Sequence, residues 1–140
     1  MHYGPPVRFE RLENVVYTSL RIISGAMFAM HGAQKILGLF APMSRPPVGS
    51  QLWVGGLIEL FGGSLIALGL FTRAVAILAA GTMAVAYFQF HFKLQLARSQ
   101  WVPLVNKGEL AVLYCFVFLF VAVRGPGAAS LDARFRRRAR

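Results

Sequence analysis

Four ionisable residues of this sequence lie inside apolar stretches, where charged groups are rare. Glu59 stands in the middle of an apolar run over residues 52–71, and Arg21, His31 and Lys35 lie in the run before it. A carboxylate among apolar residues is costly unless a cation, a hydrogen-bond donor or water accompanies it. Carboxylate and imidazole groups exchange protons, and the basic groups stabilise negative charge. These residues could therefore bind and protonate a small polar molecule.

Helical spacing places these residues on two surfaces that can face each other. At about 100° per residue, one arc of roughly 120° on the first run holds Arg21, Ser24, Gly25, His31, Gly32 and Lys35. A similar arc on the second run holds Gly55, Gly56, Glu59, Gly62 and Gly63. Small residues let membrane helices approach closely, and polar residues form hydrogen bonds across the contact. We therefore expect Glu59 to be buried within reach of His31 or Lys35.

Other polar residues extend this cluster at the same end of the predicted helices. Tyr87 and His91 are four residues apart, and Asn106 and Glu109 open the last apolar run. The sequence predicts a polar pocket in the outer half of the bundle, with Arg21, His31, Lys35, Glu59, Tyr87, His91, Asn106 and Glu109 as candidates. None of them is assigned a catalytic role.

Each candidate also has a purely structural interpretation. Glu59 with His31 or Lys35 could be an ion pair that only fixes the register of two helices. Lys35 could extend to the lipid headgroups, and His91 could be an ordinary interfacial histidine. Arg21 lies about two turns from the inner end of its helix, where it could satisfy helix-end carbonyls or reach Glu13.

The composition is that of an integral membrane protein. Hydrophobic residues make up 56% of the chain and charged residues 14%, against about 45–50% and 25% in soluble domains. Apolar runs at 15–37, 52–71, 74–92 and 109–124 predict an all-α, four-helix transmembrane bundle in one domain, the last span being short. Prolines make 41–50 a loop, and 72–73 is a tight turn. The tetrapeptide Leu-Gly-Leu-Phe follows two successive runs, at 37–40 and 68–71.

The net charge of +10 is concentrated near the two chain ends. Anionic lipids explain this distribution better than nucleic acid does, so no nucleic-acid partner is expected. With both termini cytoplasmic, nine basic residues lie inside: Arg8, Arg11, Arg73, Arg124 and the five arginines of the tail 134–140. Five lie outside: Lys35, Arg45, Lys93, Arg98 and Lys107. The positive-inside rule therefore favours a multi-pass membrane protein with both termini cytoplasmic.

Several chemistries have no support in the sequence. The single cysteine, Cys115, excludes an internal disulfide and a CxxC pair. Zinc-ligand spacing, phosphate loops, nucleophile elbows and dinucleotide motifs are absent, so no metal is expected. His31 and His91 could clamp a b-type haem, but the sequence offers no fingerprint for one and the haem interpretation is disfavoured.

Six of the candidate residues lie in segments that resemble the DoxX family of small bacterial membrane proteins, namely Arg21, His31, Lys35, Glu59, Asn106 and Glu109. The similar segments are RIISGAMFAMHGAQKILG, GGLIELFGGSLIALGLFTR, NKGELAVLY and the ending GPGAASLDAR, which together span roughly residues 20–134. The resemblance implies a four-helix membrane bundle and a link to redox metabolism. Related proteins include a subunit of a thiosulfate:quinone oxidoreductase and partners of oxidative-stress and thiol-handling enzymes. The arginine tail and the proline-rich loop are not part of this resemblance.

We therefore expect a redox-associated membrane subunit with a pocket for a quinone or a similar small head group. The sequence shows no resident electron carrier, so a partner membrane protein, a larger complex or a homo-oligomer is expected. The alternative is a structural accessory subunit without a ligand of its own. A small-molecule transporter is a third interpretation, disfavoured because four helices show no inverted repeat.

Overall fold

The computed structural model describes residues 7–40, 44–93 and 99–139, and the regular structure within them is all helical. This confirms the predicted all-α class. Four long rods form the molecule: α1 (Val7–Leu37); α2 (Gln51–Leu57), η1 (Ile58–Gly62) and α3 (Gly63–Leu68) joined end to end; α4 (Thr72–Ala86) with η2 (Tyr87–Phe92); and α6 (Glu109–Arg124). The segments η1 and η2 are π-helical turns. Two short helices complete the described chain, α5 (Pro103–Asn106) and α7 (Leu131–Arg138).

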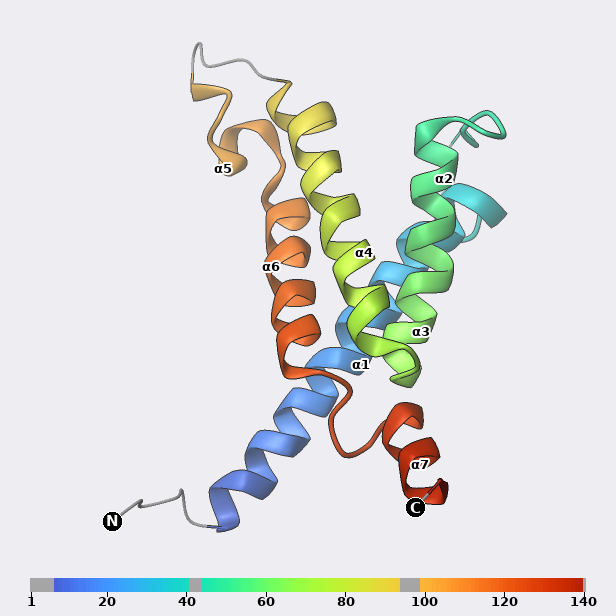
Figure 1. Cartoon of the computed structure of the whole chain (residues 1–140). Helices are drawn as coiled ribbons and strands as arrows, with labels where there is room; N and C mark the ends of the chain where they lie inside the picture. The colour runs from blue at the N-terminus through green and yellow to red at the C-terminus, as the bar shows by residue number, and fades with distance from the viewer. Residues whose placement is uncertain (1–6, 41–43, 94–98, 140) are drawn as a thin grey trace.

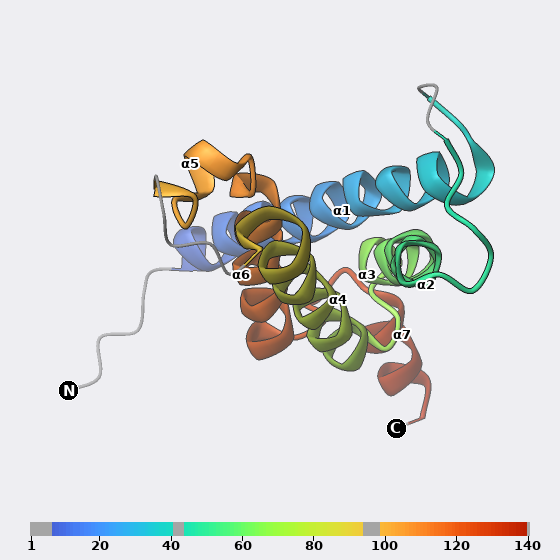
Figure 2. The ribbon, with the colours of Figure 1, turned by 90° about the horizontal axis from the view of Figure 1, so that it is seen from above.

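The four rods form two packed pairs. One pair is α1 with the α2–η1–α3 rod, and the other is α4 with α6. Figure 1 shows α4 and α6 side by side while α1 crosses behind them, and Figure 2 shows the same crossing from above. The start of α1 and the helix α7 lie at one end of the molecule, which we call the terminal end. The opposite end, where α1 stops and α6 begins, is called the pocket end below.

Glycines bring α1 and the second rod into backbone contact, as their two arcs predict. A Cβ atom on Gly25 would lie 2.6 Å from the backbone nitrogen of Ala67. A Cβ on Gly32 would collide with the backbone of Leu60. The two rods therefore touch main chain to main chain, which fixes the depth at which side chains of one meet those of the other.

The second pair packs through alanines and a buried aromatic cluster. Ala76, Ala79 and Ala80 of α4 and Ala111 and Ala122 of α6 are buried. Phe28 of α1 inserts its ring against Phe118 and Tyr114 of α6, with ring centroids 4.8 and 5.4 Å apart. These contacts join the two pairs into one core.

Large apolar side chains cover the outside of the rods, as a lipid environment requires. Exposed examples from the four rods are Ile23, Phe61, Ile77, Leu113 and Phe116. Two of the described rods, Gln51–Leu68 and Thr72–Phe92, are long and apolar enough to cross a membrane. The rod α1 carries Arg21 and Lys35, and α6 has 16 residues, fewer than the usual 20 for a span.

Helix ends at the terminal end are closed by side chains from distant segments. Arg21 is buried and donates hydrogen bonds to the carbonyls of Ile66 and Ala67 at the end of α3 and to that of Ala129. This confirms that Arg21 satisfies helix-end carbonyls. Its alternative partner, Glu13, instead forms an ion pair with Arg124, at 2.6 Å. Arg73 donates to the carbonyls of Ala122 and Val123 at the end of α6.

The boundaries of the predicted turns need small corrections. Thr72 opens α4, so the tight turn lies before it, where Gly69 and Phe71 have φ of +71° and +49°. Gly38 and Phe40, the corresponding residues of the first Leu-Gly-Leu-Phe, both have φ of +71°. The repeated tetrapeptide therefore has the same role twice, as a left-handed helix stop. Residues 44–50 contain no helix, while 41–43 of the predicted loop lie outside the described residues.

Candidate functional site

A cavity of about 200 Å³ lies between the two helix pairs in the pocket half of the molecule. Four predicted candidates line it, namely His31, Lys35, Glu59 and His91. Its apolar wall includes Phe28, Met83 and Leu110. A second cavity of about 230 Å³ shares Lys35, Glu59 and His91 and extends toward Gln51 and Leu52 of α2. At ~30 Å³ per water the first cavity has room for about six waters or one small polar head group.

Glu59 and Lys35 form a buried ion pair at the junction of the two cavities. The Lys35 amine donates to both carboxylate oxygens of Glu59 at 2.5 Å. Glu59 is 4% exposed. The prediction that Glu59 is buried and paired with α1 is confirmed, with Lys35 as the partner. His31 lies beside the pair without a hydrogen bond to Glu59 in the described structure, and its ring meets Tyr114 edge-on at 6.2 Å between centroids.

Two π-helical turns deliver the acidic and imidazole groups to the cavity. Glu59 belongs to η1, which interrupts an otherwise α-helical rod, and His91 belongs to η2, which ends the rod that begins with α4. A π turn holds one more residue than an α turn, so it rotates the side chains that follow and is often found at functional sites. Both turns therefore present polar groups to a cavity whose remaining wall is mostly apolar.

A hydrogen-bond network behind the cavity fixes the orientation of His91. Its Nδ1 lies 3.1 Å from the carbonyl oxygen of Asn106. A carbonyl only accepts, so Nδ1 carries the proton and Nε2 is left as an acceptor. The Asn106 amide donates to the Tyr87 hydroxyl and to the carbonyl of Gln100, and Tyr87 donates to the carbonyl of Trp101. Tyr87 and Asn106 are thus supports of the site, and the prediction that they face the pocket is corrected.

Two further predicted candidates lie away from the cavity. Arg21 is at the terminal end, where its guanidinium is occupied by the carbonyls described above. Arg21 does lie on the predicted polar face of α1. Because α1 has 31 residues, that face reaches both ends of the molecule, and Arg21 lies at the end away from the cavity. Glu109 is exposed and lines a separate surface groove with Leu113 and Phe116.

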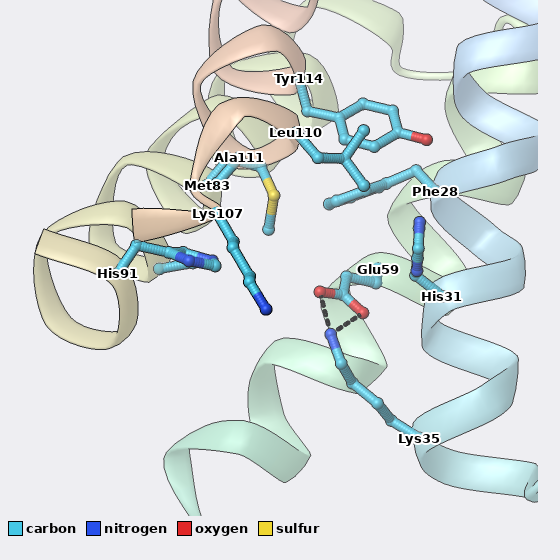
Figure 3. A pocket seen from close by; sticks show the side chains of 11 residues that line it. Phe28, His31, Lys35, Glu59, Met83, His91, Lys107, Leu110, Ala111 and Tyr114 are labelled. Atoms are coloured by element: carbon cyan, nitrogen blue, oxygen red, sulfur yellow. Dashed lines mark hydrogen bonds and ion pairs between the residues drawn. The ribbon is translucent and has the colours of Figure 1, made fainter. Parts of the chain in front are cut away.

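Two polar residues that line the cavity were not among the predicted candidates. The Tyr114 hydroxyl is buried and has no hydrogen-bond partner within the described residues. Lys107 stands in the turn before α6 with φ of +59°, and Figure 3 shows its amine directed between His91 and Glu59. The sequence signal for Tyr114 was a tyrosine in the middle of an apolar helix. The sequence offered no signal for Lys107, since basic residues are common in polar loops.

The charges of the cavity do not balance. Lys35 and Lys107 contribute two cations, while Glu59 is the one carboxylate among its lining residues. Because Lys35 is already paired with Glu59, Lys107 remains free to contact a ligand. The described part of the chain holds no group of three or more potential metal ligands. The arrangement suits a small, partly apolar molecule with oxygen acceptors or negative charge.

Comparison with known proteins identifies the family. The family model of DoxX matches residues 16–92, which include His31, Lys35, Glu59 and His91. The chain belongs to the DoxX family. DoxX proteins are membrane proteins, in agreement with the apolar outer surface described above. Tyr114 and Lys107 lie beyond the matched residues, so the site combines the matched region with the segment that follows it.

Two relatives of this DoxX protein cover most of its length. An uncharacterized protein of Haemophilus influenzae (strain ATCC 51907 / DSM 11121 / KW20 / Rd) is 40% identical over 119 residues, which is 83% of this chain and 87% of the relative. A protein of Bacillus subtilis (strain 168) named "Putative oxidoreductase CatD" is 29% identical over 119 residues, 81% of each chain. No solved structure matches the chain.

Proposed function

We propose that this DoxX protein is an integral subunit of the bacterial inner membrane whose cavity binds the head group of a quinone or a similar molecule. The Tyr114 hydroxyl carries the proposal. Tyr114 lines the cavity, and its buried hydroxyl has no partner among the described residues. A buried hydroxyl without a hydrogen bond costs about 1–3 kcal/mol. A bound carbonyl oxygen that reached this hydroxyl would accept a hydrogen bond from it and remove that cost.

The other lining residues suit the same ligand. Quinone carbonyls accept hydrogen bonds, and Lys107 supplies a second donor. Phe28, Met83 and Leu110 offer apolar surface to the ring. Reduction of a quinone takes up two protons and two electrons. Glu59 and His31 are placed to pass protons, while the electrons come from a partner redox protein, since the sequence has no CxxC pair or dinucleotide motif. The name of the Bacillus subtilis relative supports an oxidoreductase association.

A structural accessory subunit is the second candidate, favoured by the geometry of the ion pair. Lys35 contacts both oxygens of Glu59, so the two charges already satisfy each other without a ligand. In that case the pair serves only to fix the register of α1 on η1.

Substitution of Tyr114 tests the pocket directly. Tyr114→Phe removes the one buried hydroxyl that lacks a partner among the described residues, so the protein should fold with an equal or higher melting temperature. Loss of one hydrogen bond should weaken binding of a short-chain quinone by about tenfold. The matched control is Tyr17→Phe, whose hydroxyl donates to the carbonyl of Gly125 at the terminal end, away from the cavity. Isothermal titration calorimetry in detergent gives both affinities. Equal affinities in the wild type and both variants would contradict the pocket.

The ion pair separates the two candidate functions. Glu59→Leu combined with Lys35→Met replaces both charges with apolar groups of similar volume, a change that is often nearly neutral for folding. Complementation of a deletion strain should fail for the pocket function, because the proton-accepting carboxylate is gone. Full complementation by this stable double variant would leave the accessory role standing.

The same proposal includes the topology. We place the four rods across the membrane with both termini cytoplasmic, so that the pocket opens toward the outer leaflet. Support comes from the excess of basic residues at the terminal end and from the even number of rods. A partner complex or a second copy of this chain would then meet the protein within the bilayer.

A further inference from the structure

A basic groove lies at the terminal end, far from the cavity described above. It has a volume of about 370 Å³ and forms where α4, α6 and α7 meet. Four arginines line it: Arg73 at the start of α4, Arg124 at the end of α6, and Arg136 and Arg137 on α7. Figure 1 shows α7 next to the turn that leads into α4, with the end of α6 above the connection to α7.

The positive charge of this groove is only partly neutralised within the described chain. Arg124 has Glu13 as its ion-pair partner and lies over the Tyr17 ring at 5.0 Å. Arg73 donates to two neutral carbonyls, which leaves its charge uncompensated. Arg136 and Arg137 form no ion pair with a described carboxylate. Guanidinium groups that outnumber the nearby carboxylates are suited to a phosphate, whose oxygens accept paired N–H bonds from arginine.

The helix that carries two of these arginines is built for a membrane surface. Leu131 and Phe135 lie one turn apart on α7, and Phe135 is 54% exposed. The arginines occupy most of the remaining positions of this helix. A short helix with an apolar stripe and a basic face lies in the plane of the lipid headgroups. Phe135 would insert beside the lipid chains while the groove faces the phosphates.

We propose that the groove between α4, α6 and α7 binds the phosphate of an anionic phospholipid, with Arg136 and Arg137 as its principal donors. The proposal is independent of the ligand of the pocket, because the two sites lie at opposite ends of the rods and share no residue. The arginines of α7 would hold the lipid in one place on the protein, rather than attracting the leaflet as a whole.

The test compares two double variants that lose the same charge. Arg136→Gln with Arg137→Gln empties the groove of its α7 donors, whereas Arg134→Gln with Arg138→Gln removes two arginines of α7 that do not line it. Each full-length protein is reconstituted into nanodiscs that contain phosphatidylglycerol and phosphatidylcholine. Native mass spectrometry then counts the lipids that stay bound when the protein is released from the nanodisc. We expect the first variant to retain about tenfold less phosphatidylglycerol than the wild type. The control should stay close to the wild type.

Several results would overturn the proposal. Equal losses in both double variants would indicate general attraction by the basic tail, and no loss in either would mean that the groove binds no lipid. Displacement of the lipid by millimolar inorganic phosphate would show a site for free phosphate, and displacement by an oligonucleotide a site for nucleic acid. The single changes Arg136→Gln and Arg137→Gln should each give an intermediate loss of phosphatidylglycerol. They keep the test decisive if the double variant is too unstable to purify.

Discussion

At the scale of single residues, Asp132 shows how the terminal end is held together. Its carboxylate accepts hydrogen bonds from the backbone nitrogens of Phe71 and Thr72 and from the Thr72 hydroxyl. Helix α4 has no capping side chain of its own, so a residue 60 positions away provides the cap. Burial alone would raise the pKa of Asp132, but the hydrogen bonds from Thr72 and Phe71, with Arg136 nearby, outweigh it and lower that pKa.

This cap predicts a destabilised variant with a defined pH dependence. Asp132→Ala should reduce the free energy of unfolding at pH 7 by about 1–2 kcal/mol, the usual effect of losing an N-cap. A lowered pKa stabilises the fold fully above the ordinary value of 3.8 and loses that contribution as the pH falls through the folded value. Thermal melting in detergent at pH 7 and near pH 2 should therefore show the difference shrinking in acid. Glu10→Ala, an exposed carboxylate, is the control; an Asp132→Ala difference as large in acid as at pH 7 would contradict the cap.

Residue types and spacing were sufficient to find the ion pair but not its surroundings. Glu59 could be predicted to pair with His31 or Lys35, because two glycine-rich arcs had to face each other at matched depth, and the structure selects Lys35. Tyr114 could not be assigned, since its apolar neighbours look the same whether its hydroxyl meets a partner or a cavity. Lys107 enters the site through a left-handed turn, which the loop sequence does not indicate.

At the scale of elements, the crossing of α1 over the second rod sets the position of Glu59 relative to Lys35. Gly32 lies against the backbone of Leu60, one residue after Glu59. Any side chain at position 32 must push η1 away from α1 and stretch the ion pair. The contact therefore links the packing of two helices to the geometry of the site.

Gly32→Ala should consequently destabilise the protein by about 1–3 kcal/mol, the usual cost of overpacking. Gly81→Ala provides the matched control, because a Cβ there meets nothing within 4 Å and alanine favours a helix. Its melting temperature should stay the same or rise slightly. Melting in detergent compares the two, and a Gly32→Ala protein as stable as Gly81→Ala would refute close backbone contact at this crossing.

The π-helical turns mark what helical periodicity alone misses. A wheel with a constant 100° per residue places Glu59 on the glycine arc, yet η1 and η2 depart from that spacing where the site is formed. The existence of four helices follows from apolar run length, and their pairing from small residues. The π-helical turns depend on contacts between helices, which cannot be seen in the sequence of one apolar segment alone.

At the scale of the whole molecule, the pocket end and the terminal end differ in the polar groups they contain and in how those groups are used. The pocket end gathers buried polar groups from every rod around a partly apolar cavity. The terminal end uses arginine and aspartate side chains to close helix ends and exposes the remaining arginines on α7. A charge asymmetry of this kind orients a membrane protein during insertion, and that role can be tested separately from lipid binding.

We expect both termini to be cytoplasmic, with the tail arginines deciding the orientation. Alkaline phosphatase fused after Arg140 should be inactive, and the same enzyme inserted at Gly49 should be active, since it works only outside the cytoplasm. Changing Arg134, Arg136, Arg137 and Arg138 to Gln lowers the inner count from nine to five, equal to the outer count. Because orientation follows the difference in basic residues near the spans, this variant should insert in both directions and give activity at both positions. Phosphatase activity after Arg140 in the wild type would reverse the topology and turn the pocket toward the cytoplasm.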